Sequence, residues 1–374
     1  MIIYKDYKYE LDPNNMQKTI LYQHAGASRY AYNWALERVN SKTSKPNAIQ
    51  LHREWNTWKR ENAPWWNTVS KCVPQETFRN LQKAFEGFFK KKTKYPSFKS
   101  KKRSRNSFRL TGTIKSIGKY IQLPKLGKIK LKENPKVKGE ILAATIIETA
   151  NKWFVSIRTK QEIEVTENQG PSIGVDLGVK NLATLSNGQI ISGPKALKLK
   201  FPLLSRINRK LARTKKGSKR RERIRHRLAK LHYKIGCTRS DSIHKLTTML
   251  AKEYGAIGIE DLCVSGMVRN RGLARCVSDM GFGEFRRQLV YKTGWFGSRV
   301  VVFDRFFASS KLCSVCGCKK VDLGLGDRVY VCDNCGLVIN RDLNAARNLC
   351  PAVRRVLGVE ADSSIASVSN KNGP

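Results

Sequence analysis

"SIGVDLGVKNLATLSNGQI", residues 172–190, decides the fold of the second half of the chain. Two apolar segments flank Asn187-Gly188, the kind of residue pair that two-residue β-hairpin turns prefer. The first segment carries one acid, Asp176, between apolar neighbours. Because an isolated buried carboxylate is costly unless it is paired, hydrogen-bonded or bound to a metal, this strand predicts partners for Asp176 elsewhere in the chain.

Two other acids are candidates for these partners. Glu260 ends the apolar segment 256–260, and Asp342 stands at the start of a helical pattern. Two strand carboxylates and one at a helix start can converge at the end of a sheet, where divalent cations would remove their repulsion. Two magnesium ions about 3.5–4 Å apart can activate a water molecule and stabilise the leaving oxygen of a phosphodiester. This grouping favours a metal-dependent nuclease or transposase.

Each acid also has a simpler interpretation. Asp176 could accept hydrogen bonds from local backbone amides, and Glu260 could pair with an arginine. Asp342 could be no more than a helix cap. Asp261, next to Glu260, fits a turn or cap residue better than a ligand.

Two cysteine pairs have the spacing of a zinc site. "LCSVCG" and "VCDNCG" place two residues within each pair and fifteen between the pairs. The four thiols are Cys313, Cys316, Cys332 and Cys335. A glycine after each pair permits a tight turn, and four protein ligands leave no open position, so the spacing predicts a structural zinc ion. A redox pair or chance spacing is the alternative, and Cys318 is expected to be a bystander.

The charge of the chain indicates a polyanionic partner. Its 374 residues include 72 Lys or Arg and 29 Asp or Glu, a formal net charge of +43, which predicts nucleic acid. A membrane surface is the alternative, but the basic stretches lack the amphipathic aromatic pattern of such proteins. The sequence has no apolar signal core and no apolar run of membrane-spanning length. Ten cysteines, four of them at metal spacing, indicate a reducing, cytosolic setting.

The hydrophobic pattern divides the chain into segments. Residues 1–11 alternate like a strand, and 16–39 and 51–92 predict helices with an aromatic core. Short β segments over 108–164 predict a small β-barrel or sandwich, completed by the N-terminal strand. A second domain opens at Pro171, with helices over 196–253, strands at 256–261 and 299–304, and an amphipathic segment between these strands. The polar tail after Glu360 is expected to be disordered.

Two basic segments are candidates for phosphate contacts. Residues 90–105 hold nine basic residues and no acid, and their interleaved aromatics favour nucleic acid over a merely solvated charge run. In the second segment, 206–227, helices are expected to expose a basic face. An apolar stripe of the surrounding helical stretch 196–253 (Ile224, Leu228, Leu231 and Ile235) is expected to be buried. The candidate nucleic-acid-binding residues are Lys90, Lys91, Lys92, Tyr95, Phe98, Lys101, Lys102, Arg103, Arg105, Arg220, Arg221 and Arg225.

Several blocks, in this order, resemble the TnpB family of transposon-encoded RNA-guided DNA endonucleases, which is related to type V CRISPR effectors. The blocks are "YKYELDPN", "YAYNWALE", "YPSFKSKKRSRNSFRL", "IGVDLGVKNLATLSNG", "RRERIRHRLAKLHYKI", "IGIEDL", "FRRQLVYKTGW", "SSKLCSVCG", "YVCDNCG" and "NRDLNAARNL". The resemblance covers nearly the whole chain.

The resemblance implies an α/β domain plus all-β and all-α parts. An RNase H-like (RuvC) nuclease domain would occupy 171–311 and 338–360, with a zinc ribbon inserted at 312–337. A β-barrel wedge domain would comprise 1–11 and 108–166, a helical recognition domain 12–107, and a disordered tail 361–374. The catalytic, magnesium-binding acids of the family fall on Asp176, Glu260 and Asp342. Asn340 stands where the third motif often has an acid, which we interpret as variation beside the ligand set.

The implied activity is RNA-guided cleavage of DNA next to a short adjacent motif, by two-metal-ion phosphodiester hydrolysis. The implied cofactors are Mg²⁺, with Mn²⁺ as a substitute, structural Zn²⁺ and a guide RNA whose pairing supplies specificity. The expected partners are the guide RNA and a double- or single-stranded DNA target, in a monomeric ribonucleoprotein of a bacterial or archaeal cytosol, associated with the nucleoid. The alternatives are a nuclease-inactive RNA-guided repressor and a guide-independent transposase.

Overall fold

The computed structural model describes residues 1–324 and 326–356, and they form two compact units. The first unit runs from Met1 to Ile163 and the second begins at Glu164. The tail expected to be disordered, 361–374, lies outside the described residues, as do 357–360 of the predicted nuclease segment. No helix in the described ranges is both long and apolar enough to cross a membrane.

The β part of the first unit consists of two antiparallel sheets. Its four-stranded sheet has the order β1 (Ile2–Glu10), β7 (Lys152–Glu162), β6 (Glu140–Thr149) and β2 (Ser107–Leu110). A three-stranded sheet contains β3 (Lys115–Ile117), β4 (Tyr120–Leu123) and β5 (Gly127–Lys130). The N-terminal strand pairs with β7 along its whole length, as the alternation predicts. A closed barrel is not confirmed, because β1 and β2 are the edges of the four-stranded sheet.

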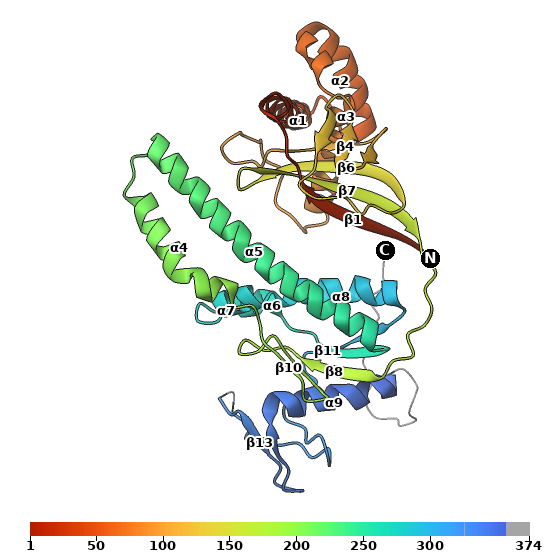
Figure 1. Ribbon diagram of the computed structural model, residues 1–374, viewed down its shortest axis with the longest axis vertical. Coiled ribbons are helices and arrows are strands. Elements are labelled where there is room, and N and C mark those ends of the chain that lie inside the picture. Colours follow the sequence, from red (N-terminus) through yellow and green to blue (C-terminus); the bar gives the residue numbers. More distant parts are fainter. Residues whose placement is uncertain (325, 357–374) are drawn as a thin grey trace. The chain divides into compact units, whose positions relative to one another are not determined.

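Three helices and a short 3₁₀ turn complete the first unit, and the helices are labelled in Figure 1. They are α1 (Asn15–Asn40), α2 (Ala48–Asn62), η1 (Pro64–Thr68) and α3 (Cys72–Phe89). The first helix begins at a capping box, in which the side chain of Asn14 accepts from the amide of Gln17 and that of Gln17 accepts from Asn14. The predicted aromatic core is formed around Trp55, which is fully buried and lies edge-to-face against Trp66.

The second unit is built on one mixed sheet. Its strand order is β10 (Ile190–Ile191), β9 (Ala183–Leu185), β8 (Ser172–Asp176), β11 (Ala256–Glu260) and β12 (Arg299–Phe303). Strands β8, β9 and β10 are antiparallel, whereas β11 is parallel to both β8 and β12. The predicted hairpin joins β9 to β10, but it is not the two-residue turn expected at Asn187-Gly188. The amide of Gly188 donates to the carbonyl of Leu185 at 2.9 Å, so Ser186 and Asn187 are the central turn residues and Gly188 follows them with a φ of 93°.

Helices cover both faces of this sheet. On one face α5 (Lys219–Glu253) and α8 (Phe282–Phe296) pack together, and on the other lies α9 (Arg341–Val356) (Figure 1). Two shorter helices, α6 (Val264–Arg269) and α7 (Ala274–Met280), lie in the chain between β11 and α8. The α5 side of the sheet buries Phe285 and Leu289, and the α9 side buries Leu349 and Val353.

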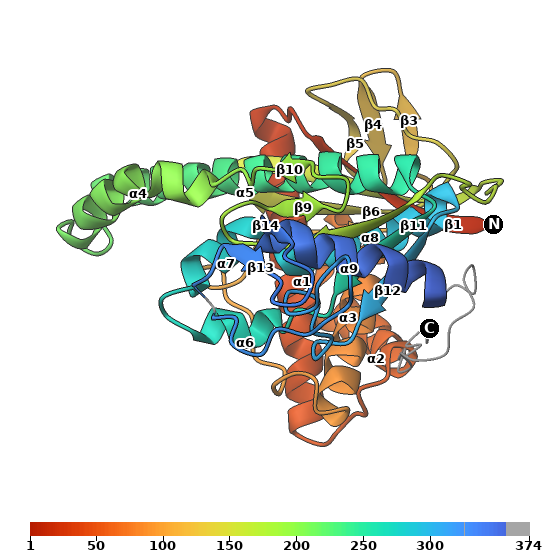
Figure 2. The same cartoon turned by 90° about the horizontal axis from the view of Figure 1, so that it is seen from below.

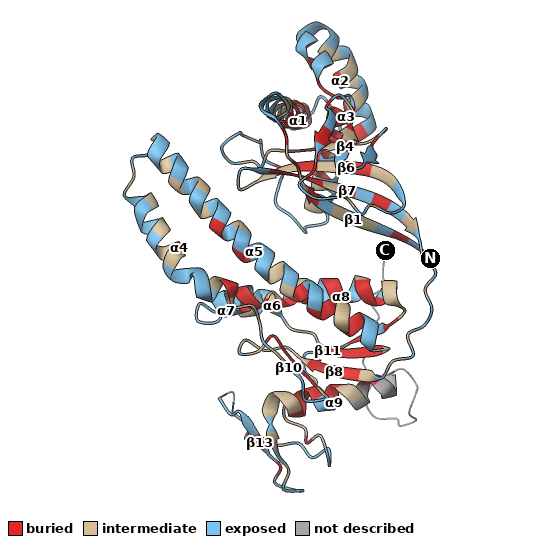
Figure 3. Cartoon of the chain, viewed as in Figure 1, coloured by how far each residue is buried: buried red, intermediate tan, exposed pale blue. Residues whose placement is uncertain are grey.

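An antiparallel helical pair extends beyond the sheet. Helix α4 (Ala196–Ala212) and the first half of α5 run side by side, as Figure 1 and Figure 2 show. The predicted apolar stripe is buried in part: Leu231 and Ile235 are buried against Leu204, whereas Ile224 and Leu228 are half-buried. The basic faces remain exposed (Figure 3).

Candidate functional site

Two of the candidate acids end adjacent parallel strands. Asp176 is the last residue of β8 and Glu260 the last of β11. The register pairs Val175 with Ile259, so the next residue of each strand is one of the two acids. Since residues in the same row of a sheet project to the same face, both acids point to the same side of the sheet.

Glycines bring α9 onto that side. Gly174 and Gly258 precede the two acids by two positions and therefore share their face. A Cβ atom at Gly174 would overlap the carbonyl oxygen of Ala346 in α9, and one at Gly258 would lie 2.8 Å from the carbonyl oxygen of Leu349. The helix backbone therefore rests directly on these strands.

The third acid lies at the beginning of the same helix. Asp342 is the second residue of α9, one helical turn before Ala346, and so lies on the helix face that meets the sheet. The cap of this helix is Asn340, whose side-chain oxygen accepts from the amides of Asp342 at 2.9 Å and Leu343 at 3.2 Å. The interpretation of Asp342 as the cap itself is therefore wrong.

Asp176 is close enough to the two other acids for their negative charges to affect its pKa. The pKa of Asp176 is raised to about 8, first by burial and then by the negative charges of Glu260 and Asp342, while Arg341 opposes the rise. The Asp176 side chain is nevertheless partly exposed, and among the described residues no hydrogen bond reaches its carboxylate. The local backbone amides of the simpler interpretation are therefore not its partners.

Glu260 has a hydroxyl partner and no ion pair within the described ranges. The Oγ of Ser309, in the loop after β12, donates to Glu260 Oε1. Burial raises the pKa of Glu260, and the Ser309 hydrogen bond and the charge of Arg341 oppose that rise. The arginine pair that we considered for Glu260 is formed by the neighbouring acid instead, because Asp261 forms ion pairs with Arg286 and Arg305.

The three acids fit a divalent cation by their chemistry. Carboxylate oxygens are the ligands that Mg²⁺ prefers, and a cation would relieve the desolvation and repulsion that raise the pKa of Asp176. The carboxylate oxygens of the three acids do not all lie within 4.8 Å of one another. Among the described residues, the only group of three or more His, Cys, Asp or Glu that meets this distance is the set of four cysteines described below.

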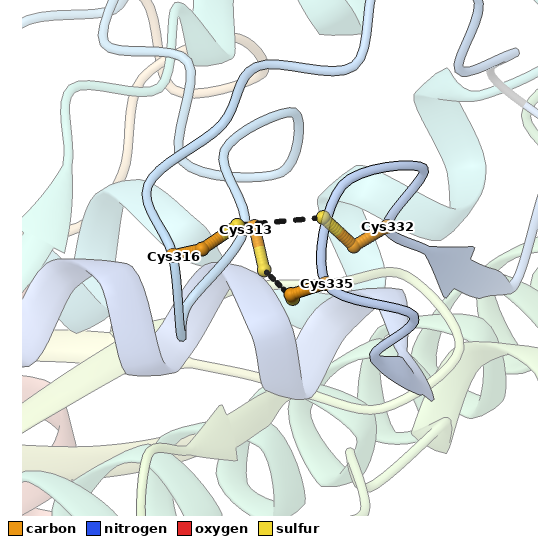
Figure 4. Close-up of side chains that lie close together, drawn as sticks. All are labelled: Cys313, Cys316, Cys332 and Cys335. Carbon is orange, nitrogen blue, oxygen red and sulfur yellow. Dashed lines mark hydrogen bonds between the residues drawn. The ribbon is translucent and has the colours of Figure 1, made fainter.

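The four predicted cysteines converge on one point (Figure 4). The sulfur atoms of Cys313 and Cys335 are 3.5 Å apart, as are those of Cys316 and Cys332. Sulfurs at about 2.3 Å from a tetrahedral zinc ion would be separated by about 3.7 Å, whereas a disulfide needs about 2.05 Å. The cluster therefore has the dimensions of a zinc site, and Cys318 lies outside it.

Two similar turns build the cluster. Gly317 and Gly336 follow the cysteine pairs with φ of 75° and 68°, and their amides donate to the carbonyls of Cys313 and Cys332. The amide of Cys318 donates to Cys316 and is the main cause that lowers the pKa of that thiol to about 6. A thiolate is the form that binds metal, so this turn prepares a ligand.

Polar side chains of α9 join the cluster to the acids. Asn344 donates to the carbonyl of Leu312 at 2.6 Å and accepts from the amide of Ser314 at 2.9 Å. Asn348 donates to the carbonyl of Ser309 at 2.7 Å. Strands β13 (Val329–Val331) and β14 (Val338–Asn340) complete this small element, and β14 leads directly into α9.

Most candidate nucleic-acid-binding residues lie on the surface. Tyr95 and Phe98 are 47% and 57% exposed, and all basic candidates but one are exposed. The exception is Arg221, which donates to the carbonyls of Leu211 at 2.6 Å and Thr214 at 2.9 Å and so closes the turn between α4 and α5. Sequence reasoning missed Ser309 and the capping role of Asn340, because both depend on contacts that no periodicity reveals.

Family models match three parts of the chain. A model described as "Probable transposase" matches residues 155–271, one described as "Cas12f1-like, TNB domain" matches 282–349, and one described as "Helix-turn-helix domain" matches 1–43. Among solved structures, a mini-RNA-guided endonuclease, CRISPR-Cas_phi3, is similar with a TM-score of 0.49 and 10% identity, covering 94% of this chain and 92% of its own.

Curated relatives found by sequence have higher identity to this chain than that solved structure. A Streptomyces pristinaespiralis protein named "Putative RNA-guided DNA endonuclease" is 35% identical, covering 92% of this chain and 88% of its own. "Putative RNA-guided DNA endonuclease InsQ" of Escherichia coli K12 is 31% identical, covering 94% and 92%. A mimivirus "TnpB-like protein L79" is 28% identical over 48% of this chain and 36% of its own. With such identity over nearly its full length, the chain belongs to the TnpB family.

Proposed function

We propose that this protein is an RNA-guided DNA endonuclease that hydrolyses phosphodiesters with divalent cations at Asp176, Glu260 and Asp342. The observation that carries this proposal is geometric: Asp176 and Glu260 end adjacent parallel strands, and Asp342 lies in the first turn of the helix that packs on their face of the sheet. Such an arrangement is unfavourable for a purely structural site and suits one that binds cations. The relatives named as RNA-guided DNA endonucleases support the guide and the DNA target.

The sheet topology supports an RNase H-like (RuvC) assignment for the second unit. Three antiparallel strands followed by two parallel ones, in the order β10-β9-β8-β11-β12, suit that fold. We assign residues 171–311 and 338–360 to this nuclease domain and 312–337 to an inserted zinc ribbon. In the first unit we assign the helices to a recognition domain (12–107) and the β-rich remainder (1–11 and 108–166) to a wedge domain.

The protein's own side chains prepare the reaction. Asp176, Glu260 and Asp342 would hold Mg²⁺, with Mn²⁺ as a substitute, and when bound such ions supply an activated water and a stabilised leaving oxygen. Ser309 orients Glu260 through its hydrogen bond. Asn340 fixes the first turn of α9, which carries Asp342. Asp261 holds two arginines next to Glu260, where their positive charge can attract a DNA phosphate.

The remaining parts serve binding and stability. The four-cysteine cluster would hold a structural zinc ion, because its four ligands leave no position for a substrate. The exposed basic residues of the loop after α3 and of the α4–α5 pair would contact phosphates. Base pairing between a guide RNA and the target strand would supply the sequence specificity, in a monomeric ribonucleoprotein.

One experiment tests this function against its two alternatives. The purified ribonucleoprotein is incubated with Mg²⁺ and a DNA carrying the sequence complementary to the copurified RNA, with and without RNase treatment before assembly. We expect cleavage that requires Mg²⁺ and disappears after RNase treatment. Bound but uncut DNA would identify a repressor, and cutting that survives RNase would identify a transposase.

A further inference from the structure

A polar pocket of about 330 Å³ lies within the first unit, between α1, α3, β2, β6 and the loop that follows α3. Its volume is at the lower end of the range for ligand pockets, about 300–1,000 Å³. Four cations line it, and none of its lining side chains is acidic. These cations are Arg29, Lys99, Arg105 and Arg109, and we call the cavity the Lys99 pocket. Hydroxyl and amide side chains form most of the remaining wall.

Lys99 is held in this pocket, and no acid of the described residues pairs with it. Its backbone is fixed to α1, because the amide donates to Asn33 Oδ1 at 2.7 Å and the carbonyl accepts from Asn33 Nδ2 at 2.9 Å. Its ammonium lies 3.6 Å from the ring centroid of Tyr32. Burial and the positive charge of Arg29 lower the pKa of Lys99 to about 8, and no acid opposes this. The fold therefore maintains a desolvated cation against the repulsion of a second one.

Of the other cations, Arg29 binds a neutral side chain and Arg109 shares an acid with a third arginine. Arg29 donates to the neutral side chain of Asn106 at 2.6 Å, and burial lowers its pKa. Glu76, which pairs with Arg109 at 3.2 Å, is shared with Arg79 at 2.7 Å. Positive charge therefore exceeds negative charge around the pocket, and an anion would relieve the excess.

We propose that the Lys99 pocket binds a phosphodiester group of a nucleic-acid strand. Guanidinium groups present a planar fork of donors that matches phosphate oxygens, and lysine supplies a point charge. The exposed basic residues of the same loop would guide the neighbouring phosphates toward the pocket. The identity of the strand, guide RNA or target DNA, rests on the proposed function; the phosphate chemistry is common to both.

The test compares matched substitutions in the full-length protein freed of copurified RNA. Lys99→Gln removes the unpaired cation, Lys99→Arg keeps the charge, and Lys83→Gln removes an exposed lysine of α3 outside the pocket. Dissociation constants for a single-stranded RNA and a duplex DNA of equal length are measured over a range of salt concentrations. We expect Lys99→Gln to raise the dissociation constant about tenfold and to reduce the slope of log affinity against log salt concentration by about 1. The dissociation constant of Lys99→Arg should stay near that of the parent protein. Lys83→Gln should change the dissociation constant less than Lys99→Gln does.

Thermal unfolding separates this role from a structural one. Because Lys99 is desolvated next to Arg29, Lys99→Gln should unfold at the same or a higher temperature while binding more weakly. A larger effect on RNA identifies an RNA phosphate, and a larger effect on duplex DNA identifies a DNA phosphate. Equal affinities and salt slopes for Lys99→Gln and Lys83→Gln, with both probes, would overturn the proposal. The cleavage assay is independent, since a parent protein that binds without cutting would contradict the proposed function and leave the pocket result standing.

Discussion

Gly174 and Gly258 lie opposite each other on the parallel strands β8 and β11, and both leave space for the backbone of α9. This pair sets the distance between the sheet and the helix, and with it the position of Asp342 relative to the strand acids. Side chains larger than hydrogen at these positions have no room, because the atoms that they would meet include helix backbone.

Gly174→Ala should therefore push α9 away from the sheet. We expect a loss of about 1–3 kcal/mol in the free energy of unfolding and a marked loss of cleavage. Gly236→Ala is the matched control, because Gly236 lies inside α5 with open space around it and should gain about 0.5–1 kcal/mol. Urea unfolding and a cleavage assay measure both effects. Full activity and stability in Gly174→Ala would show that α9 does not depend on this close approach.

Asp176→Asn should abolish cleavage and leave RNA binding intact. The substitution keeps the shape of the side chain and removes the charge needed to hold a cation, so the cleavage rate should fall by at least about a thousandfold. Asp241→Asn, which breaks only an exposed pair with Lys245 on α5, provides the control. Single-turnover cleavage and an RNA-binding assay test the pair, and equal rates would remove Asp176 from the mechanism.

The same carboxyl group predicts how the stability of the magnesium-free protein depends on pH. The pKa of Asp176 is raised to about 8 from an ordinary value of 3.8. A pKa raised by folding contributes stability below pH 4 that is lost as the pH rises to 8. Asp176→Asn should therefore be more stable than the parent above pH 8, by an amount on the order of a few kcal/mol that shrinks toward pH 4.

Thermal unfolding at several pH values measures this difference. Mg²⁺ should raise the unfolding temperature of the parent at pH 8 and have little effect on Asp176→Asn. The same pH slope in the two proteins would show that Asp176 does not titrate in this range.

Ser309→Ala should raise the Mg²⁺ concentration needed for cleavage. The lost hydroxyl is the hydrogen-bond donor that orients Glu260, and partners of metal ligands typically change metal affinity by about tenfold or more. Ser310→Ala alters the neighbouring hydroxyl and should leave the requirement unchanged. Cleavage measured against Mg²⁺ concentration compares the two, and identical curves would exclude a positioning role for Ser309.

Cys332→Ser should release the zinc ion and loosen the second unit. Zinc analysis should find one ion per chain in the parent and in Cys318→Ser, and less than one in Cys332→Ser. Because Asn344 and Asn348 tie α9 to the loop that enters the cluster, the loss should also reduce cleavage. Retention of zinc by Cys332→Ser would contradict the four-cysteine assignment.

The sequence predicted those features whose signal is local. The cysteine spacing anticipated the cluster, and Asn187-Gly188 anticipated the hairpin that joins β9 to β10. Asp176 and Glu260 were recognisable because a carboxylate in an apolar strand needs a partner, and Asp342 because it stands at the start of a helical pattern. The sequence did not reveal that Asn340 caps α9. Asn340 stands at the position where the third motif often has an acid, so the pattern alone indicates a replacement of that acid and not a helix cap.

Other features depend on contacts between distant segments. The role of Arg221 in closing a turn was hidden within a run of basic residues that looked alike. Lys99 was likewise one of nine basic residues in its loop, and only the fold places it beside Tyr32 and Arg29. Charge runs can thus predict the class of partner, but they do not distinguish the cations that build a pocket from those that remain in solvent.

The order of elements around the cysteine cluster has a consequence for the newly made chain. Synthesis reaches Asp342 last among the three acids, and the route to it passes through both cysteine turns and β14. On the proposed function, an immature molecule that has not yet captured zinc would lack a firmly seated third carboxylate. Zinc binding would then precede the assembly of the three acids at the end of the sheet.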